Sequence, residues 1–146
     1  MHIAFVLIPW FLGTIVGGET PKNENKYVNL QIVLATDTLH AGDADVLRIS
    51  LTPVEGIHIN ADPPVEVTLE KNTVVDLDGE PEMSTDKETG FLEVSEPIEQ
   101  RLSISRKATP GWHAFKGTIV YYFCSETQGW CTKFVQQFSL QVNVTK

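Results

Sequence analysis

Hydrophobic and polar residues alternate along most of the chain after Tyr27, with a period of two rather than 3.6. A period of two is typical of strands that bury one face and expose the other. The pattern therefore predicts strands over residues 30–34, 47–51 and 102–104. The residues expected to face inward are Leu30, Ile32, Leu34, Leu47, Ile49, Leu51, Leu102 and Ile104.

The clearest pair of strands comes last. Residues 115–123 and residues 134–144 both place large hydrophobic side chains at alternate positions. These side chains are Phe115, Ile119, Tyr121 and Phe123 in the first segment, and Phe134, Phe138, Leu140, Val142 and Val144 in the second. Because a short loop joins the two segments, they predict a β-hairpin with that loop at its tip.

Turn signals such as HAGDAD, NADPP, DLDGEP and TPGWH separate the expected strands, and no stretch has the apolar period and caps of an amphipathic helix. About seven short strands in about 120 residues indicate an all-β protein, an immunoglobulin-like antiparallel β-sandwich. Residues 78–97 are acidic and do not alternate. They are expected to form a long irregular excursion over the surface.

The first residues have a different composition. Residues 3–16, IAFVLIPWFLGTIV, carry no charge and precede the small pair Gly17 and Gly18. The run is short for a membrane span and predicts a signal peptide over residues 1–18, with an uncleaved N-terminal anchor as the alternative. A flexible lead-in over 19–26 and one domain over 27–146 would follow. The expected localisation is periplasmic or otherwise exported, where disulfides persist.

The formal net charge is −8, and Lys and Arg form no basic stripe. Such a domain repels phosphate backbones, which argues against nucleic-acid binding. The chain contains no GxSxG elbow, no HExxH motif and no glycine-rich phosphate loop. Catalysis without the cysteines is therefore not indicated, and no cofactor is expected.

The only two cysteines, Cys124 and Cys131, stand in the expected hairpin loop with six residues between them. A bond between them closes a loop of about eight residues, worth about 2.5 kcal/mol by chain entropy, so a structural staple is one interpretation. A metal site is a second, but it needs ligands beyond two cysteines. The histidines that could supply them are scattered: His40, His58 and His113.

A redox pair is the third interpretation, because a disulfide at an exposed tip is accessible to the thiolates of other proteins. Lys133 would favour a cysteine thiolate, whereas Glu126 would oppose it. Trp130, next to Cys131, is expected to face a partner or shield the disulfide. Trp112 is expected to pack on the sheet instead. His58 has outward parity and could approach the thiols.

Two stretches, GIHINADPP at residues 56–64 and PGWHAFKGTIVYYFCSETQGWC at residues 110–131, resemble the N-terminal periplasmic domain of the bacterial thiol:disulfide interchange protein DsbD and its stand-alone relatives. Both lie in the family's order, and the resemblance extends from about residue 27 to 144. It implies an immunoglobulin-like fold whose two cysteines cycle between dithiol and disulfide. Cys131 would form the mixed disulfide with partners, and Cys124 would resolve it.

The resemblance also implies partners. A membrane-embedded thiol-electron donor would supply electrons, and thioredoxin-like redox proteins, such as disulfide isomerases and those of cytochrome c biogenesis, would receive them. The sequence departs from the family by having six rather than five residues between the cysteines, and by following the second with TKF rather than prolines. The family's aromatic side chain over the disulfide has one candidate counterpart, Phe91, in the acidic segment.

Two functional hypotheses follow. In the first, the protein is an exported thiol–disulfide exchange domain that relays electrons through Cys124 and Cys131 without a bound cofactor. In the second, it is a non-catalytic immunoglobulin-like binding or structural module, and the disulfide only staples the hairpin.

Overall fold

The computed structural model describes residues 23–146, so the predicted signal peptide lies outside the described residues. Within this part of the chain there are nine strands and no helix. The strands are β1 (Val28–Leu34), β2 (Thr38–His40), β3 (Ala44–Pro53), β4 (Ile57–Ile59), β5 (Glu66–Leu69), β6 (Val75–Leu77), β7 (Ile98–Ile104), β8 (Gly111–Ser125) and β9 (Trp130–Thr145). The described residues accordingly include no helix long and apolar enough to cross a membrane.

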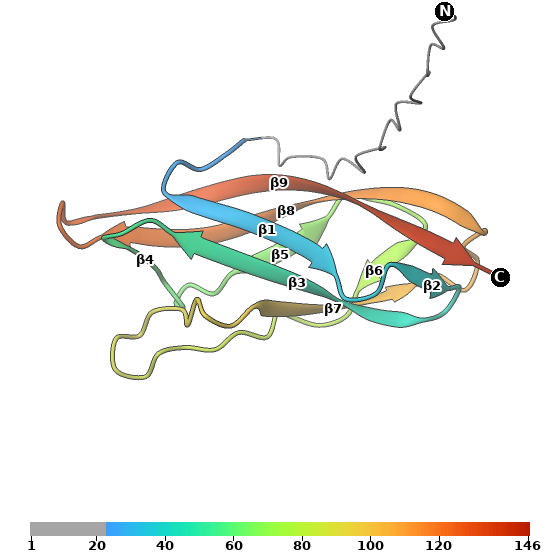
Figure 1. Cartoon of the computed structure of the whole chain (residues 1–146), viewed down its shortest axis with the longest axis horizontal. Coiled ribbons are helices and arrows are strands. Elements are labelled where there is room, and N and C mark those ends of the chain that lie inside the picture. The colour runs from blue at the N-terminus through green and yellow to red at the C-terminus, as the bar shows by residue number, and fades with distance from the viewer. Residues whose placement is uncertain (1–22) are drawn as a thin grey trace, which may run out of the picture.

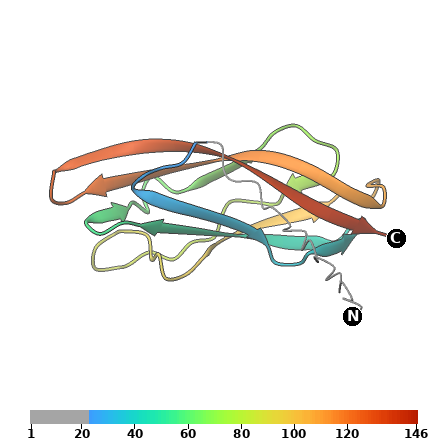
Figure 2. The same ribbon diagram turned by 45° about the horizontal axis from the view of Figure 1, so that its top comes forward.

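The strands form two sheets that pack face to face (Figures 1 and 2). One sheet has the order β1-β3-β7-β6 and is antiparallel throughout. The other has the order β2-β9-β8-β4, and β5 also pairs with β8. The predicted all-β, immunoglobulin-like sandwich is confirmed, except that β2 runs parallel to β9 rather than antiparallel.

The core lies between the sheets, and most of the residues predicted to face inward are buried in it. Four of them are half-buried and pack against it: Ile32, Leu34, Phe134 and Leu140. On β8, every second side chain from Phe115 to Phe123 is buried. On β9, the inward row contains one polar residue, Gln136, which is fully buried. Its Oε1 accepts a hydrogen bond of 3.0 Å from the Tyr121 hydroxyl, so the polar side chain is paired within the core.

Gly117 also belongs to the inward row of β8, where it lies opposite Phe138. A Cβ atom at this position would lie 2.5 Å from the Phe138 ring and 2.5 Å from the Thr68 carbonyl oxygen on β5. Only glycine therefore allows the Phe138 ring to cover β8 at this point while β5 pairs alongside.

The acidic segment at residues 78–97 forms the irregular excursion that the sequence predicts. It is nevertheless fastened to both sheets, because Glu82 bridges Glu99 on β7 and Phe91 bridges Asn60 just after β4. Leu92 is buried in the core. The excursion lies at the same end of the sandwich as the turn between β8 and β9 (Figures 1 and 2).

The described part of the predicted lead-in contacts the sheet. Asn23 donates a hydrogen bond of 2.8 Å to the Val135 carbonyl and accepts one of 3.2 Å from the Gln137 amide. Asn25 donates to the Tyr121 hydroxyl over 3.1 Å. Residues 23–25 are thereby held along β9 and at the edge of the core.

The prediction that Trp112 packs on the sheet is wrong. Trp112 is 67% exposed. It is the second residue of β8 and lies on the outward face, opposite Asn143 at the end of the sandwich away from the cysteines. Within residues 23–146, no other layer covers the outward face there, and the indole is exposed.

Candidate functional site

The cysteines lie at the closed end of the β8–β9 hairpin, where the strand register brings them directly opposite each other. The pair Ser125 and Trp130 follows, and residues 126–129 make the turn. Gly129 has φ +69°, a conformation that glycine adopts without strain, and its amide donates 2.9 Å to the Ser125 carbonyl. The Ser125 hydroxyl accepts from the Gln128 amide, so the turn is closed by local hydrogen bonds.

Cys124 and Cys131 form the predicted disulfide, with an S–S distance of 2.03 Å and Cα atoms 4.0 Å apart. The cysteines belong to the paired strands rather than to the loop, which corrects the expectation that they stand in the loop itself. Since fifteen register pairs join β8 and β9, the hairpin already holds the two residues side by side. The disulfide therefore joins two residues that strand pairing already holds next to each other, and it links no separate parts of the fold.

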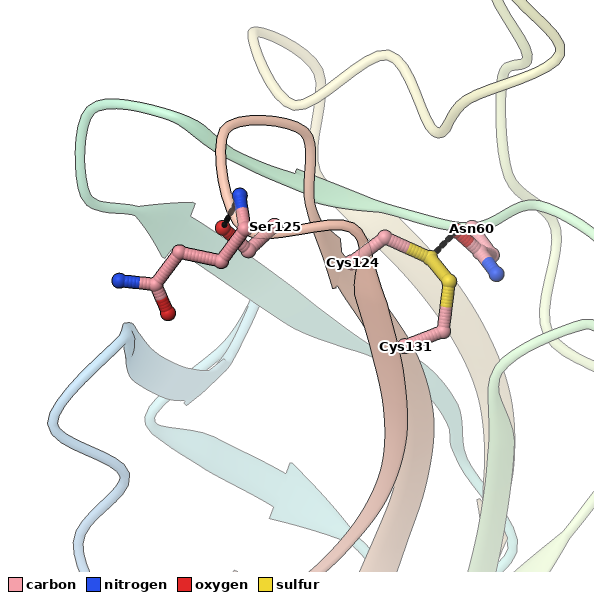
Figure 3. Close-up of a disulfide and its surroundings, with 5 residues drawn as sticks. Asn60, Cys124, Ser125 and Cys131 are labelled. Atoms are coloured by element: carbon pink, nitrogen blue, oxygen red, sulfur yellow. Dashed lines mark hydrogen bonds between the residues drawn. A yellow bond between two sulfur atoms is a disulfide. The ribbon is translucent and has the colours of Figure 1, made fainter.

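The disulfide projects from the outer face of the sheet. Phe123 and Ser125, the neighbours of Cys124, are buried, whereas Cys124 itself is half-buried and Cys131 is exposed. Figure 3 shows the two sulfur atoms on one side of the hairpin and the Ser125 side chain on the other. This alternation is the ordinary consequence of strand geometry. Of the two cysteines, Cys131 is the more exposed residue.

A third strand extends this outer row. His58 on β4 lies directly opposite Cys124, so the two side chains share a face. The His58 ring stacks on Phe91 with centroids 4.6 Å apart and planes 11° from parallel. Its Nε2 lies 3.0 Å from the Glu126 carboxylate in the turn. The structure thus brings His58, Phe91 and Glu126 together beside the disulfide.

Asn60 completes the surroundings of Cys124. Its side-chain Oδ1 lies 3.3 Å from Cys124 Sγ (Figure 3). Its backbone is fixed as well, because its amide donates 2.9 Å to the Tyr122 carbonyl on β8 and it bridges Phe91. Sequence reasoning did not single out Asn60. The sequence did offer one indication. Asn60 is two residues after His58, so in an extended strand both side chains lie on the same outward face.

Trp130 lies on the other side of the hairpin from Cys131. Its indole packs edge-on against Tyr27, with centroids 5.3 Å apart, and against Phe123 at 5.8 Å. The indole Nε1 donates 2.8 Å to Gln128 Oε1 in the turn. Trp130 is half-buried and stabilises the base of the turn, and the structure does not bring its ring over the disulfide.

The remaining histidines lie away from the cysteines. His40 pairs with Asp43 over 3.3 Å, and His113 contacts the Thr109 carbonyl over 2.6 Å. Within residues 23–146, no three His, Cys, Asp or Glu side chains are grouped as a metal ion would require. Only His58, of the three histidines considered as ligands, lies beside the cysteine pair.

Comparison with known proteins gives no relative: no protein-family model, curated protein or solved structure matches this chain. The chemistry of the site is therefore argued from its own geometry. It consists of one disulfide on an outer sheet face, between an exposed cysteine, Cys131, and a half-buried one, Cys124, which has an amide and an imidazole next to it.

Proposed function

We propose that the protein is an exported thiol–disulfide exchange domain that relays electrons between redox partner proteins through Cys124 and Cys131. The observation that carries the proposal is the unequal exposure of the two sulfur-bearing residues, with Cys131 exposed and Cys124 half-buried. Exchange requires that an incoming thiolate reach one sulfur in line with the bond. An exposed Cys131 meets this requirement.

The oxidised protein accepts two electrons in two steps. A thiolate of a dithiol partner attacks Cys131 Sγ, so that a mixed disulfide forms, the Cys124–Cys131 bond breaks, and Cys124 leaves as a thiolate that takes a proton. The partner's second thiolate then attacks the partner's first cysteine sulfur, which is bonded to Cys131 in the mixed disulfide. The partner's own disulfide forms, and Cys131 leaves as a thiolate that takes a proton. The partner ends as a disulfide, and the protein ends as a dithiol.

Delivery of the electrons reverses these steps. The Cys131 thiolate attacks the disulfide of an oxidised partner, and one partner sulfur leaves as a thiolate. Cys124 then attacks Cys131 Sγ, which reforms the internal disulfide and releases the partner as a dithiol. Both directions use only cysteine sulfur and protons, so the exchange needs no bound cofactor.

The partners follow from the resemblance to the DsbD N-terminal domain. We expect a membrane thiol-electron donor on one side and thioredoxin-like redox proteins on the other, in the periplasm or another exported compartment. Nucleic acid is not expected to bind the domain, given its net charge of −8. A membrane would be contacted only through an uncleaved leader, if at all. Protein substrates also suit a site that lies on an open sheet face.

The test is the reduction potential of Cys124–Cys131, measured by equilibrating the domain against glutathione and dithiothreitol buffers and alkylating the free thiols. An exchange domain should titrate within the range of known exchange proteins, roughly −120 to −270 mV. A value well below about −300 mV would identify a structural staple. The non-catalytic binding module would then be the better account of the fold.

A further inference from the structure

The contact between Asn60 and Cys124 has a chemical peculiarity. Asn60 Oδ1 lies 3.3 Å from Cys124 Sγ, but a sulfur atom in a disulfide carries no hydrogen. The oxidised protein therefore has no proton to share between these two atoms. The amide is held next to the sulfur by its backbone, which bonds to Tyr122 and bridges Phe91.

Reduction changes what the amide can do. A Cys124 thiol can donate its hydrogen to Asn60 Oδ1, whereas a Cys124 thiolate can accept one from Nδ2 after the amide rotates by 180° about its last torsion. Hydrogen bonds to an ionised acceptor are about twice as strong as neutral ones. Asn60 is thus a neutral group that can bind either form of the reduced sulfur and favours the charged one.

We propose that Asn60 is a further catalytic residue, whose amide stabilises the Cys124 thiolate as the leaving group of exchange. This inference rests on the proposed function. When a partner thiolate attacks Cys131 Sγ, the bonding electrons pass to Cys124 Sγ, which is the sulfur beside the amide. Attack on Cys124 would instead release the thiolate of Cys131, an exposed residue. The amide therefore directs attack to Cys131, the exposed residue of the pair, and speeds that attack.

Three charged or titratable side chains also lie near the Cys124–Cys131 pair. His58 lies opposite Cys124, Glu126 pairs with His58, and Lys133 follows Cys131 at the next outward position of β9. Substitution of Asn60 changes none of these three residues. The variants and the wild type therefore carry the same other charged groups near the cysteine pair.

Two substitutions separate the electrical role of the amide from its shape. Asn60→Ala removes the hydrogen bond, and Asn60→Asp keeps the shape but places a carboxylate beside the developing thiolate. The rate of reduction of the disulfide by dithiothreitol is followed by quenching and alkylation. We expect Asn60→Ala to slow reduction about tenfold and Asn60→Asp to slow it further, because one loses a charge-assisted hydrogen bond and the other adds repulsion.

A second readout uses the Cys131→Ser background, where Cys124 is the only thiol. The rate of alkylation of Cys124 by iodoacetamide is measured against pH. Its midpoint should move to higher pH in Asn60→Ala and further in Asn60→Asp, because alkylation requires the thiolate. Asn29→Asp, an exposed site on β1, is the matched control for the added charge and should leave both readouts unchanged.

The outcomes are distinguishable. If Asn60→Ala reacts at the wild-type rate, Asn60 has no such role and the inference is overturned, because slowing in Asn60→Asp alone would reflect only the added carboxylate. If the wild-type disulfide itself does not exchange with dithiothreitol or thioredoxin-like proteins, the proposed function fails instead. Thermal unfolding of each variant, compared with wild type, shows that any slowing arises in a folded protein.

Discussion

His58 and Cys124 lie directly opposite each other on the antiparallel strands β4 and β8, so that both side chains project from one face of the sheet. His58 also stacks on Phe91 and pairs with Glu126. The acidic excursion and the hairpin turn therefore both contact the neighbour of the disulfide. The residue paired with Cys124 is thus contacted by a segment that is distant in the sequence.

The first prediction concerns access to Cys124. Phe91→Ala removes the ring that stacks on His58, and the space beside Cys124 opens. We expect reduction of the disulfide by small thiols to accelerate about three- to tenfold, because access limits exchange. The rate is measured by alkylation of quenched samples. Val94→Ala, an exposed site on the same excursion, is the control. Equal rates in the two variants would show that Phe91 does not shield the site.

The second prediction concerns the contribution of the disulfide to the fold. The double substitution Cys124→Ser and Cys131→Ser should preserve the β-sheet circular dichroism, because the bond lies outside the core on a hairpin of fifteen register pairs. The free energy of unfolding should fall by at most about 2.5 kcal/mol. Urea denaturation measures this difference. Loss of the folded state would mean that the bond is needed to form the sandwich.

The third prediction concerns the buried pair of Tyr121 and Gln136. Tyr121→Phe leaves Gln136 Oε1 in the core without its donor. We expect the free energy of unfolding to fall by about 1–3 kcal/mol. Tyr122→Phe, which removes the hydroxyl of a half-buried tyrosine on the outward face of β8, is the control and should lower the free energy of unfolding less. Equal losses in the two variants would indicate that the buried hydrogen bond contributes nothing.

The fourth prediction is the pH dependence that the same tyrosine introduces. Burial raises the pKa of Tyr121 above its ordinary value of 10.0, although the hydrogen bond from Asn25 opposes this. Above pH 10 the unfolded chain loses the phenolic proton while folded Tyr121 keeps it, so stability is complete below that pH and falls as the pH rises through the raised pKa. Denaturation in a pH series should show this alkaline loss in wild type and a smaller one in Tyr121→Phe.

The fifth prediction tests the close approach at Gly117. Gly117→Ala would place a Cβ atom 2.5 Å from both the Phe138 ring and the Thr68 carbonyl oxygen. We expect destabilisation of about 1–3 kcal/mol, measured by urea denaturation. Adding Phe138→Leu should restore only part of the loss, since the backbone oxygen cannot retreat as a side chain can. A Gly117→Ala variant as stable as wild type would contradict the packing described for this strand.

Much of the architecture was predictable because alternation is a local property. Each residue of a strand faces the side opposite to its neighbour, so the inward row of β8 and the hairpin with β9 follow from the order of side chains alone. The disulfide was predictable too, since the chain has two cysteines and the hairpin sets them near each other. The irregular conformation of the acidic excursion was predictable because its hydrophobic and polar residues do not alternate.

The side chains that lie next to the disulfide were decided only by the tertiary structure. Alternation assigns His58 and Asn60 to an outward face, but it does not say which residue of which strand lies opposite them. A shift of β4 by two residues along β8 would keep every face and change every neighbour. The observed register of β4 on β8, together with the bridge from the excursion to Asn60, brings Asn60 to Cys124 across 64 positions of sequence.

Trp112 and Trp130 illustrate the same division. Both are aromatic residues in the same hairpin, and local sequence supports a packed or an exposed position for either one. Trp112 is exposed because no segment of the described residues covers its face at that end of the sandwich. Trp130 is half-buried because Tyr27, from the start of the domain, packs against it. The sequence by itself determined which segments are strands and which faces point inward. The packing of distant segments, which depends on the free energy of the whole core, decided which outward side chains meet at the disulfide.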